Sequence, residues 1–329
     1  MALIENEGVR AQEQKHCSLC QSEGVLLYRD LRDRLFRAPG RWSFRHCRIC
    51  NFIWLDPQPI PDDSSKLYIE YFTHQEEISR NKRADQGESS WEKLKNIVLL
   101  GRHREREEYR LMFLSGERPG RLLDVGCGDG RFLSLFSDLG WEVIGIEPDA
   151  QAAIVAKERG LQIIVGKVEE IDLTPNSFDA ITLSHVIEHV HNPIGLLRRC
   201  FNLLKLGGKL AITTPNIKSL GHRLFKESWL GLDPPRHFYL FSPRSLKRVV
   251  ESSDLGVVIM NTGARLASGV FEAGLSIRAT GQRRGQLYDG LNKFGHTVAR
   301  SMFVAFEFWL NMAFGNLGEE IGILAVRRR

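Results

Sequence analysis

The chain of 329 residues lacks the features that mark membrane-spanning, secreted or strongly nucleic-acid-binding proteins. It has no run of about 18 uncharged apolar residues, so we expect no transmembrane helix. Its first residues are polar and contain no apolar signal-peptide core, which indicates a cytoplasmic protein. Charge of one sign is in little excess, because the net charge is only +5. This balance favours an anionic substrate, or a peripheral place at the inner face of a membrane, without demanding nucleic acid.

Cysteine is also scarce, yet four of the six cysteines form a pattern. Cys17 and Cys20 make one C-x-x-C pair, and Cys47 and Cys50 make a second after 26 intervening residues. Thiolates at this spacing favour one structural Zn(II) ion in tetrahedral coordination. A redox-active pair is the alternative interpretation. The arginine-rich segment between the pairs is either a solvated hairpin face or a phosphate contact.

The remaining sequence predicts a tail at 1–15, a zinc-ribbon-like module at 16–60, a helical connector at 61–118 and a larger domain at 119–329. Apolar runs alternate with helical periodicity in the larger domain, which indicates an α/β fold with a doubly wound, mainly parallel sheet of seven strands. Residues 264–318 form a helical insertion before the last strand. The expected strands are 121–125, 141–147, 161–165, 178–184, 209–214, 257–261 and a final one within 319–329.

A glycine-rich turn follows the first strand of this domain. Asp124 lies near the strand end, and Gly126, Gly128 and Gly130 follow at every second position. Glycine lets the backbone turn sharply and approach a ligand closely, so the turn predicts a nucleotide-cofactor cradle. The G-x-G-x-G spacing differs from the G-x-G-x-x-G of dinucleotide-binding proteins, which argues against NAD. Glu147, at the end of the second strand, is placed to accept hydrogen bonds from ribose hydroxyls.

The successive segments DVGCGDG, VIGIEPD, VGKVEEIDL, NSFDAITLSHVIEHV and LKLGGKLAITTPN resemble the motifs of class I S-adenosylmethionine (SAM) methyltransferases. They are similar in particular to the branch that includes ubiquinone-biosynthesis and sugar methyltransferases, and the resemblance covers about residues 119–261. It implies a Rossmann-like fold, with the glycine turn at the amino-acid end of SAM and Val168 offering its backbone to the adenine. Lys167 departs from the acid that many relatives carry there. The predicted cofactor-binding residues are Asp124, Gly126, Cys127, Gly128, Gly130, Glu147, Lys167, Val168 and Ser184.

Candidate catalytic residues follow the fourth strand and the fifth. His185, Glu188 and His189 match the H-x-x-E-H pattern of zinc proteases, but that pattern needs a helix and here begins at a strand end. Related quinone methyltransferases carry a similar run beside the substrate. These residues therefore serve as base or substrate ligand, or they only brace the following helix. His237, in the run DPPRHFYLF, is a third candidate base, and this run resembles methyltransferases of bacterial cell-surface polysaccharide pathways.

We therefore expect a SAM-dependent methyltransferase that acts on a small molecule or glycan. The favoured acceptor is a hydroxyl of a sugar, nucleotide-sugar or glycolipid in cell-surface polysaccharide synthesis. The alternatives are an RNA methyltransferase, a quinone O-methyltransferase, and a non-enzymatic SAM-binding or zinc-ribbon interaction module. No N/D-P-P-Y/F motif follows the fourth strand, which disfavours amino-group methylation of nucleic acid.

The helical insertion carries an aromatic stripe. Phe303, Phe306, Trp309, Leu310 and Phe314 recur at three- and four-residue steps, and Arg300 and Glu307 are the only charges between Val298 and Gly318. Three interpretations stay open: a lid over an apolar acceptor, a membrane-surface helix, and an ordinary core or dimer helix. The closing arginines 327–329 would suit contact with anionic headgroups.

Overall fold

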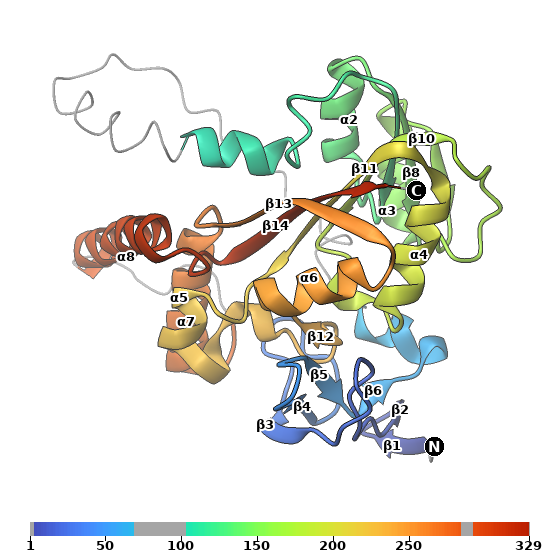
Figure 1. Ribbon diagram of the computed structural model, residues 1–329. Helices are drawn as coiled ribbons and strands as arrows, with labels where there is room; N and C mark the ends of the chain where they lie inside the picture. Colours follow the sequence, from blue (N-terminus) through green and yellow to red (C-terminus); the bar gives the residue numbers. More distant parts are fainter. Residues whose placement is uncertain (1–2, 69–102, 284–291, 329) are drawn as a thin grey trace, which may run out of the picture.

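A seven-stranded sheet forms the centre of the larger domain (Figure 1). The computed structural model describes residues 3–68, 103–283 and 292–328. The sheet order is β13-β14-β11-β10-β7-β8-β9, with β7 to β11 parallel and β14 antiparallel to both of its neighbours. The strands are β7 (Arg121–Val125), β8 (Glu142–Glu147), β9 (Ile163–Val165), β10 (Phe178–Ser184), β11 (Leu204–Pro215), β13 (Leu255–Gly263) and β14 (Glu320–Arg327). The predicted α/β fold is therefore confirmed.

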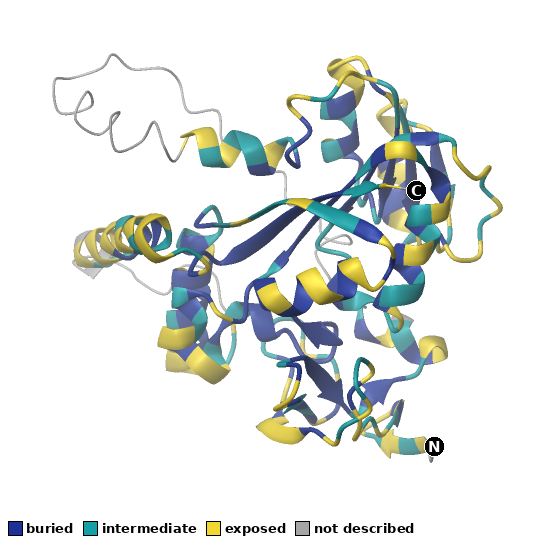
Figure 2. Ribbon diagram, in the orientation of Figure 1, coloured by how far each residue is buried: buried dark blue, intermediate teal, exposed yellow. Residues whose placement is uncertain are grey.

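Helices cover this sheet, and their ends follow local sequence signals. The Asn192 side chain accepts a hydrogen bond from the Gly195 amide at the start of the fourth helix, and Pro193 occupies its first turn. Ser242 and Ser245 form a reciprocal capping box before another. The covering helices are α2 (Arg131–Asp138), α3 (Ala150–Glu158), α4 (Pro193–Leu203) and α6 (Pro243–Glu251). Their inward faces and the central strands form the dark blue core in Figure 2.

A smaller β domain precedes the larger one and contains two sheets. One has the order β12-β5-β4-β3 and the other the order β1-β2-β6. Their strands are β1 (Leu3–Asn6), β2 (Val9–Gln12), β3 (Val25–Leu31), β4 (Trp42–His46), β5 (Ile53–Asp56), β6 (Gln58–Pro59) and β12 (Tyr239–Leu240), and a 3-10 helix, η1 (Pro61–Leu67), follows β6. β12 belongs to the larger domain by sequence but pairs with β5 of the smaller one.

The predicted tail at 1–15 is wrong for residues 3–12, which form the β1–β2 hairpin. Glu7 and Gly8 both have positive φ, at 50° and 96°, as a two-residue hairpin turn requires. Val9 and Ala11 are fully buried, so the polar sequence conceals an anchored strand. The connector predicted at 61–118 lies partly outside the described residues, as does the helical stretch expected at 91–100. Within it, η1 and a helix at 103–110 are described.

Two helices lie between β13 and β14, where the sequence predicts an insertion. They are α7 (Ala267–Thr280) and α8 (Asn292–Phe314), and α7 packs on both α8 and α5. The segment that follows β11 contains α5 (Leu220–Phe225), η4 (Lys226–Ser228) and η5 (Leu230–Leu232), with a further short 3-10 turn, η3 (Ile187–His189), after β10. No helix in the described part of the chain is long and apolar enough to cross a bilayer.

Candidate functional site

The glycine turn between β7 and α2 is built as a cradle. Gly126, Gly128 and Gly130 have φ values of 74°, 54° and 77°, a region that side chains rarely adopt. A Cβ on Gly126 would lie 2.6 Å from the Val186 side chain, and one on Gly130 would lie 2.5 Å from Leu161. A Cβ on Gly128 would meet no atom within 4 Å. Two of the glycines therefore allow close packing, whereas Gly128 borders open space that a ligand can occupy.

Glu147 joins this turn to the end of β8. One carboxylate oxygen accepts a hydrogen bond from the Gly128 amide and the other from the Asp149 amide, both at 2.8 Å. Burial raises the pKa of Glu147, while these two amides lower it. Each carboxylate oxygen has a second lone pair, so ribose hydroxyls can still donate to it. The carboxylate thus fixes the turn as well as presenting acceptors.

Asp124 is a second buried acid beneath the turn. It is 2% exposed, and its Oδ1 accepts a hydrogen bond from Thr182 Oγ1 at 2.7 Å. Burial raises the pKa of Asp124 to about 7. Within the described residues, neither Asp124 nor Glu147 has an ion-pair partner. Two buried acids without a cation suit a cationic ligand, and SAM carries both an ammonium and a sulfonium charge. The residues present therefore fit SAM.

The other predicted cofactor residues lie at the carboxyl ends of neighbouring strands. Val168 is buried, and its carbonyl accepts a hydrogen bond from an arginine of α4. Lys167 is exposed, with its Nζ 3.8 Å from a carboxylate oxygen of Glu170. Cys127 is buried inside the turn, where burial raises its pKa, so it fills space. Ser184 ends β10 and directly precedes His185.

His185 is held between two acids and is not a free base. Its Nε2 lies 2.8 Å from Glu320 Oε1, and its Nδ1 lies 3.3 Å from Glu188 Oε1. Burial alone would lower the pKa of His185, but the two carboxylates raise it to about 10. Arg265 pairs with the same Glu320 at 2.7 Å. His185 is therefore charged near neutral pH, because its site is an ion-pair network.

His189 and His237 form a separate pair of rings. Their rings lie 4.7 Å apart, and each Nδ1 hydrogen-bonds a backbone carbonyl, that of Arg236 for His189 and that of Gly231 for His237. Since a carbonyl only accepts, Nδ1 carries the proton and Nε2 is left as an acceptor. Burial, together with the neighbouring His237, lowers the pKa of His189 to about 4.

Glu188 completes this cluster. A carboxylate oxygen of Glu188 and one ring nitrogen from each of His189 and His237 all lie within 4.8 Å of one another. Burial alone would raise the pKa of Glu188, but its ion pair with His185 lowers it to about 2. Its other oxygen accepts from Thr214 Oγ1 at 2.9 Å. The three groups could share a proton or a metal ion.

The histidine cluster adjoins the cofactor cradle. Val186 follows His185 and is the side chain that a Cβ on Gly126 would strike. The His185 amide donates to the Thr213 carbonyl, which fixes the turn after β10 against β11. His185, the first of the residues expected at the acceptor, is therefore the sequence neighbour of Val186, which adjoins the glycine turn.

Arg236 has a role that the sequence did not show. It is fully buried and forms two hydrogen bonds with Asp33, at 2.6 and 2.8 Å, and an ion pair with Asp233. Its guanidinium also donates to the Leu67 carbonyl and lies 4.7 Å from the ring centre of Phe36. Arg236 thus binds the segment before His237 to the smaller domain. An arginine directly after two prolines was the sequence signal here, and it did not identify Asp33.

The backbone after His237 makes the same connection. The Phe238 amide donates to the Glu188 carbonyl at 2.7 Å, and the Phe238 carbonyl accepts from the Leu55 amide at 2.9 Å. Tyr239 then pairs with Trp54 as β12 joins the sheet of the smaller domain. Consequently Phe238 makes one backbone hydrogen bond to the candidate acceptor cluster, at Glu188, and one to the smaller domain, at Leu55.

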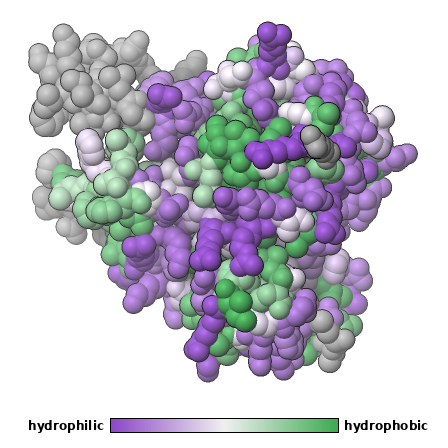
Figure 3. Space-filling view, in the orientation of Figure 1, coloured by the Kyte–Doolittle hydropathy of each residue, from purple (hydrophilic) through white to green (hydrophobic). Residues whose placement is uncertain are grey.

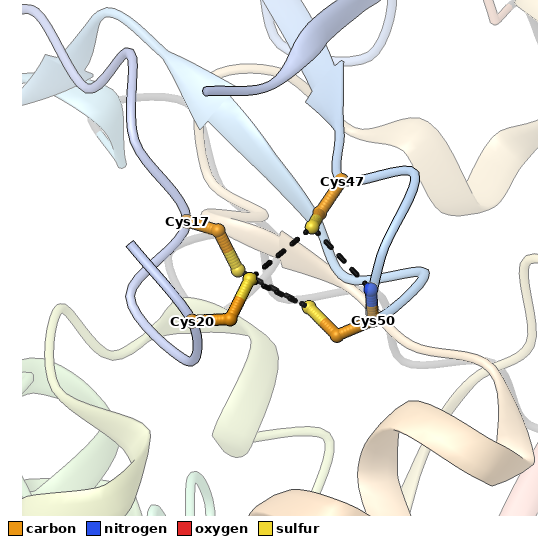
Figure 4. A group of neighbouring side chains, drawn as sticks. All are labelled: Cys17, Cys20, Cys47 and Cys50. Carbon is orange, nitrogen blue, oxygen red and sulfur yellow. Dashed lines mark hydrogen bonds between the residues drawn. The ribbon is translucent and has the colours of Figure 1, made fainter. Parts of the chain in front are cut away.

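Four cysteine sulfurs gather at one end of the smaller domain (Figure 4). The Sγ–Sγ distances are 3.3 Å for Cys17–Cys50, 3.5 Å for Cys20–Cys47 and 3.7 Å for Cys20–Cys50. The two loops repeat one geometry, because the amide four residues after Cys17 or Cys47 donates to that cysteine's carbonyl. No disulfide joins the cysteines, which are all free.

These sulfurs fit a zinc ion. Ligands about 2.3 Å from a tetrahedral zinc lie about 3.8 Å from one another, close to the separations in the cluster. The pKa of Cys47 is lowered to about 6, because hydrogen bonds from Ser22 and neighbouring groups outweigh burial. The four predicted metal ligands therefore come together as the spacing indicated.

Comparison with known proteins adds to this geometry. Residues 101–258 match a family model described as a methyltransferase domain. The mitochondrial ubiquinone biosynthesis O-methyltransferase of Mus musculus is 33% identical over 153 residues, which are 42% of this chain and 41% of that protein. Its Homo sapiens counterpart is 34% identical over 169 residues, 45% of this chain and 46% of that protein. The chain thus spans less than half the length of these relatives.

A solved structure, a SAM-dependent methyltransferase and possible histamine N-methyltransferase from Thermotoga maritima, is 18% identical with a TM-score of 0.46. It covers 72% of this chain and 96% of its own.

Proposed function

We propose that this chain, whose residues 101–258 form a class I SAM-dependent methyltransferase domain, transfers a methyl group from SAM to a hydroxyl of a small molecule. The observation that carries the proposal is the adjacency of two sites. Open space at Gly128 and two buried acids without an ion-pair partner among the described residues suit the cofactor, and the amide of His189, one of the proton-accepting pair, donates to the carbonyl of Val186 beside the glycine turn. When bound, SAM supplies an electrophilic methyl group.

At the cofactor end, charge and backbone shape do the work. Asp124 and Glu147 balance the cationic cofactor, and the glycine turn leaves open space in which the cofactor can approach the backbone. Because both acids are buried, this attraction is screened less than on the surface. The predicted ligand role of Glu147 is kept, with the further role of holding the Gly128 amide.

At the acceptor end, an Nε2 atom of His189 or His237 accepts the proton that the hydroxyl loses. Glu188 stabilises the positive charge that then develops on the imidazole. His185, already charged, positions Glu188 rather than accepting a proton. The rest of the rate enhancement comes from holding the two reactants in line in a site shielded from water.

The acceptor we favour is a phenolic hydroxyl, of the kind found in quinone precursors. The named relatives act in ubiquinone biosynthesis, whereas they give no support to the glycan acceptor expected from the sequence. Chemistry points the same way, because a phenol has a pKa of about 10 and a neutral histidine deprotonates it far more readily than an alcohol.

The test is a turnover assay with the full chain, SAM and two acceptor panels, one of hydroxylated aromatic compounds and one of nucleotide-sugars. We expect S-adenosylhomocysteine to form with members of the first panel, and not with Gly128→Val as the matched inactive protein. Turnover confined to the sugar panel would refute the phenol, and no SAM binding by calorimetry would refute the cofactor.

A further inference from the structure

The helix α8 exposes an apolar face, whereas an ordinary surface helix buries its apolar face. Its outward face is apolar over four turns, with exposed fractions of 41% for Val298, 67% for Met302, 57% for Phe306, 51% for Trp309 and 64% for Met312. At 100° per residue these positions fall within about a third of the helix circumference. Surface helices normally bury such a stripe and expose their charges.

The two charged residues of α8 whose side chains the structure describes, Arg300 and Glu307, lie on the opposite side of the helix. Glu307 is fully buried, and its Oε1 accepts a hydrogen bond from the Glu319 amide at 3.0 Å. Burial raises the pKa of Glu307 to about 10, so this side chain is neutral at physiological pH. Arg300 pairs with Glu272 of α7 at 2.6 Å. Between residues 298 and 313 the outward face of α8 therefore carries no charge.

The stripe is too large for an incidental exposure. Fifteen residues of helix extend about 22 Å. Each of the five large side chains exposes roughly 100 Å², about half the area of an aromatic side chain. The total of roughly 500 Å² reaches the size of the largest apolar patch on an ordinary monomer, which is often functional. Figure 3 shows hydrophobic residues of α8 at one edge of the molecule.

Exposed cations outnumber exposed acids in the segments that contain α5, η4 and α7. α7 packs on α8, and α5 and η4 pack on α7, while Figure 3 shows hydrophilic surface beside the apolar helix. Within residues 216–230 and 264–283 the exposed acids are Glu227 and Glu272, and Arg300 pairs with the second. The exposed cations of the same two ranges are Lys218, Arg223, Lys226, Arg278 and Arg283.

We propose that the outward face of α8, with the cations of α5, η4 and α7, is a docking surface for an anionic membrane. Trp309 and Phe306 enter the boundary between headgroups and acyl chains, and the cations meet lipid phosphates. Hydrocarbon requires no hydrogen bonds, and among the five stripe side chains only the Trp309 indole carries an N–H, a group suited to the headgroup boundary. A second copy would bring the same positive charge, and protein interfaces usually carry hydrogen bonds across the contact.

Arg327 is not part of this surface. It ends β14, at the opposite end of that strand from Glu320, and donates to the Leu204 carbonyl and the Asn176 side chain. The headgroup contact expected of Arg327 therefore does not join α8, and Arg329 lies outside the described residues. Arg265, just before α7, pairs with Glu320, so the proposed surface and the candidate acceptor cluster are joined through α7.

Vesicle flotation with the full chain tests this proposal. The vesicles are phosphatidylcholine alone or mixed with phosphatidylglycerol, at low and high salt. The stripe variant is Phe306→Gln/Trp309→Gln. The matched control is Leu206→Gln, since Leu206 is 72% exposed and lies near the start of β11, at the end of that strand away from α5. We expect binding to anionic vesicles that weakens with salt, falls about tenfold or more in the stripe variant and persists in the control.

A second variant, Met302→Gln/Met312→Gln, guards against misfolding of the first, and circular dichroism checks both. Failure of the wild-type chain to float with anionic vesicles overturns the proposal. So does equal flotation of either folded stripe variant. A wild-type dimer that the stripe variants convert to monomers, without flotation, assigns the face to a second copy instead. None of these readouts depends on methyl transfer.

Discussion

The buried pair between Arg236 and Asp33 offers the sharpest test of how the two domains work together. Asp33→Asn removes the charge that faces a fully buried guanidinium and leaves only one acceptor oxygen. The same carboxylate accepts from the amides of Leu35, Phe36 and Ala38, so the loop after β3 loses support as well. Removing one partner of a buried ion pair costs about 3–5 kcal/mol when the other charge is left uncompensated, and because Arg236 keeps its ion pair with Asp233 we expect the lower end, about 3 kcal/mol. Asp33→Asn should therefore destabilise the whole protein by this amount.

Urea unfolding measures the loss, and Glu7→Gln is the control. Glu7 pairs with Arg32 at 2.9 Å on the exposed side of the same domain, where screening makes such pairs weak. We expect its unfolding midpoint to match that of the wild type. SAM affinity should hold in the folded Asp33→Asn protein, while turnover falls about 100-fold, because a displacement of about 1 Å at His237 suffices for this. Equal stability of the two variants would refute the reasoning, and so would unchanged turnover of Asp33→Asn.

Three further predictions concern the cofactor, the metal and the base. Gly128→Val should abolish SAM binding in calorimetry, since its Cβ would occupy the open space at the turn. Wild-type affinity for SAM should fall by up to about tenfold per pH unit below pH 7, because Asp124 must lose its proton to meet a cation and its pKa is about 7 in the protein without SAM. Asp124→Asn should flatten that pH profile. Metal analysis should find one zinc per chain, and a chelator should reduce turnover but not SAM affinity; protein without zinc would contradict this. His189→Ala or His237→Ala should lower turnover about 10²–10⁴-fold at unchanged SAM affinity, whereas wild-type rates in both would leave proximity as the only catalyst.

The sheet could be predicted because its signals are local. β7 and β10 have the bounds that the sequence indicates, since each is a short apolar run closed by a turn. The edge strand β13 is longer than predicted, because its pairing with β14 extends past the central apolar run to a glycine at each end, Gly256 and Gly263, and to Leu255 and Thr262. The β1–β2 hairpin was missed for a related reason: its stability comes from Val9 and Ala11, buried by partners far along the chain.

In the candidate site, too, the features set by local sequence could be predicted, and those set by distant residues could not. The glycine turn, Glu147 and the four cysteines follow from spacing alone, since each depends on residues close in sequence. The state of each histidine does not follow from spacing. His185 and His189 are four residues apart in one motif, yet Glu320 and Glu188 hold the first as a cation, while burial keeps the second neutral. Glu320 lies 135 residues beyond His185, so no local pattern could reveal the pair.

The boundary that the sequence suggests between the cysteine module and the methyltransferase domain is not a boundary in the hydrogen-bond network. Phe238 donates to the carbonyl of Glu188 and accepts from the amide of Leu55, and β12 completes the smaller domain's sheet. Both partners of this connection are backbone groups, which any sequence supplies and which therefore leave no motif. A zinc ion that fixes the cysteine loops would consequently stabilise the sheet to which the segment after His237 belongs. The metal would then act on the acceptor site through strand pairing, at a distance from the reacting atoms.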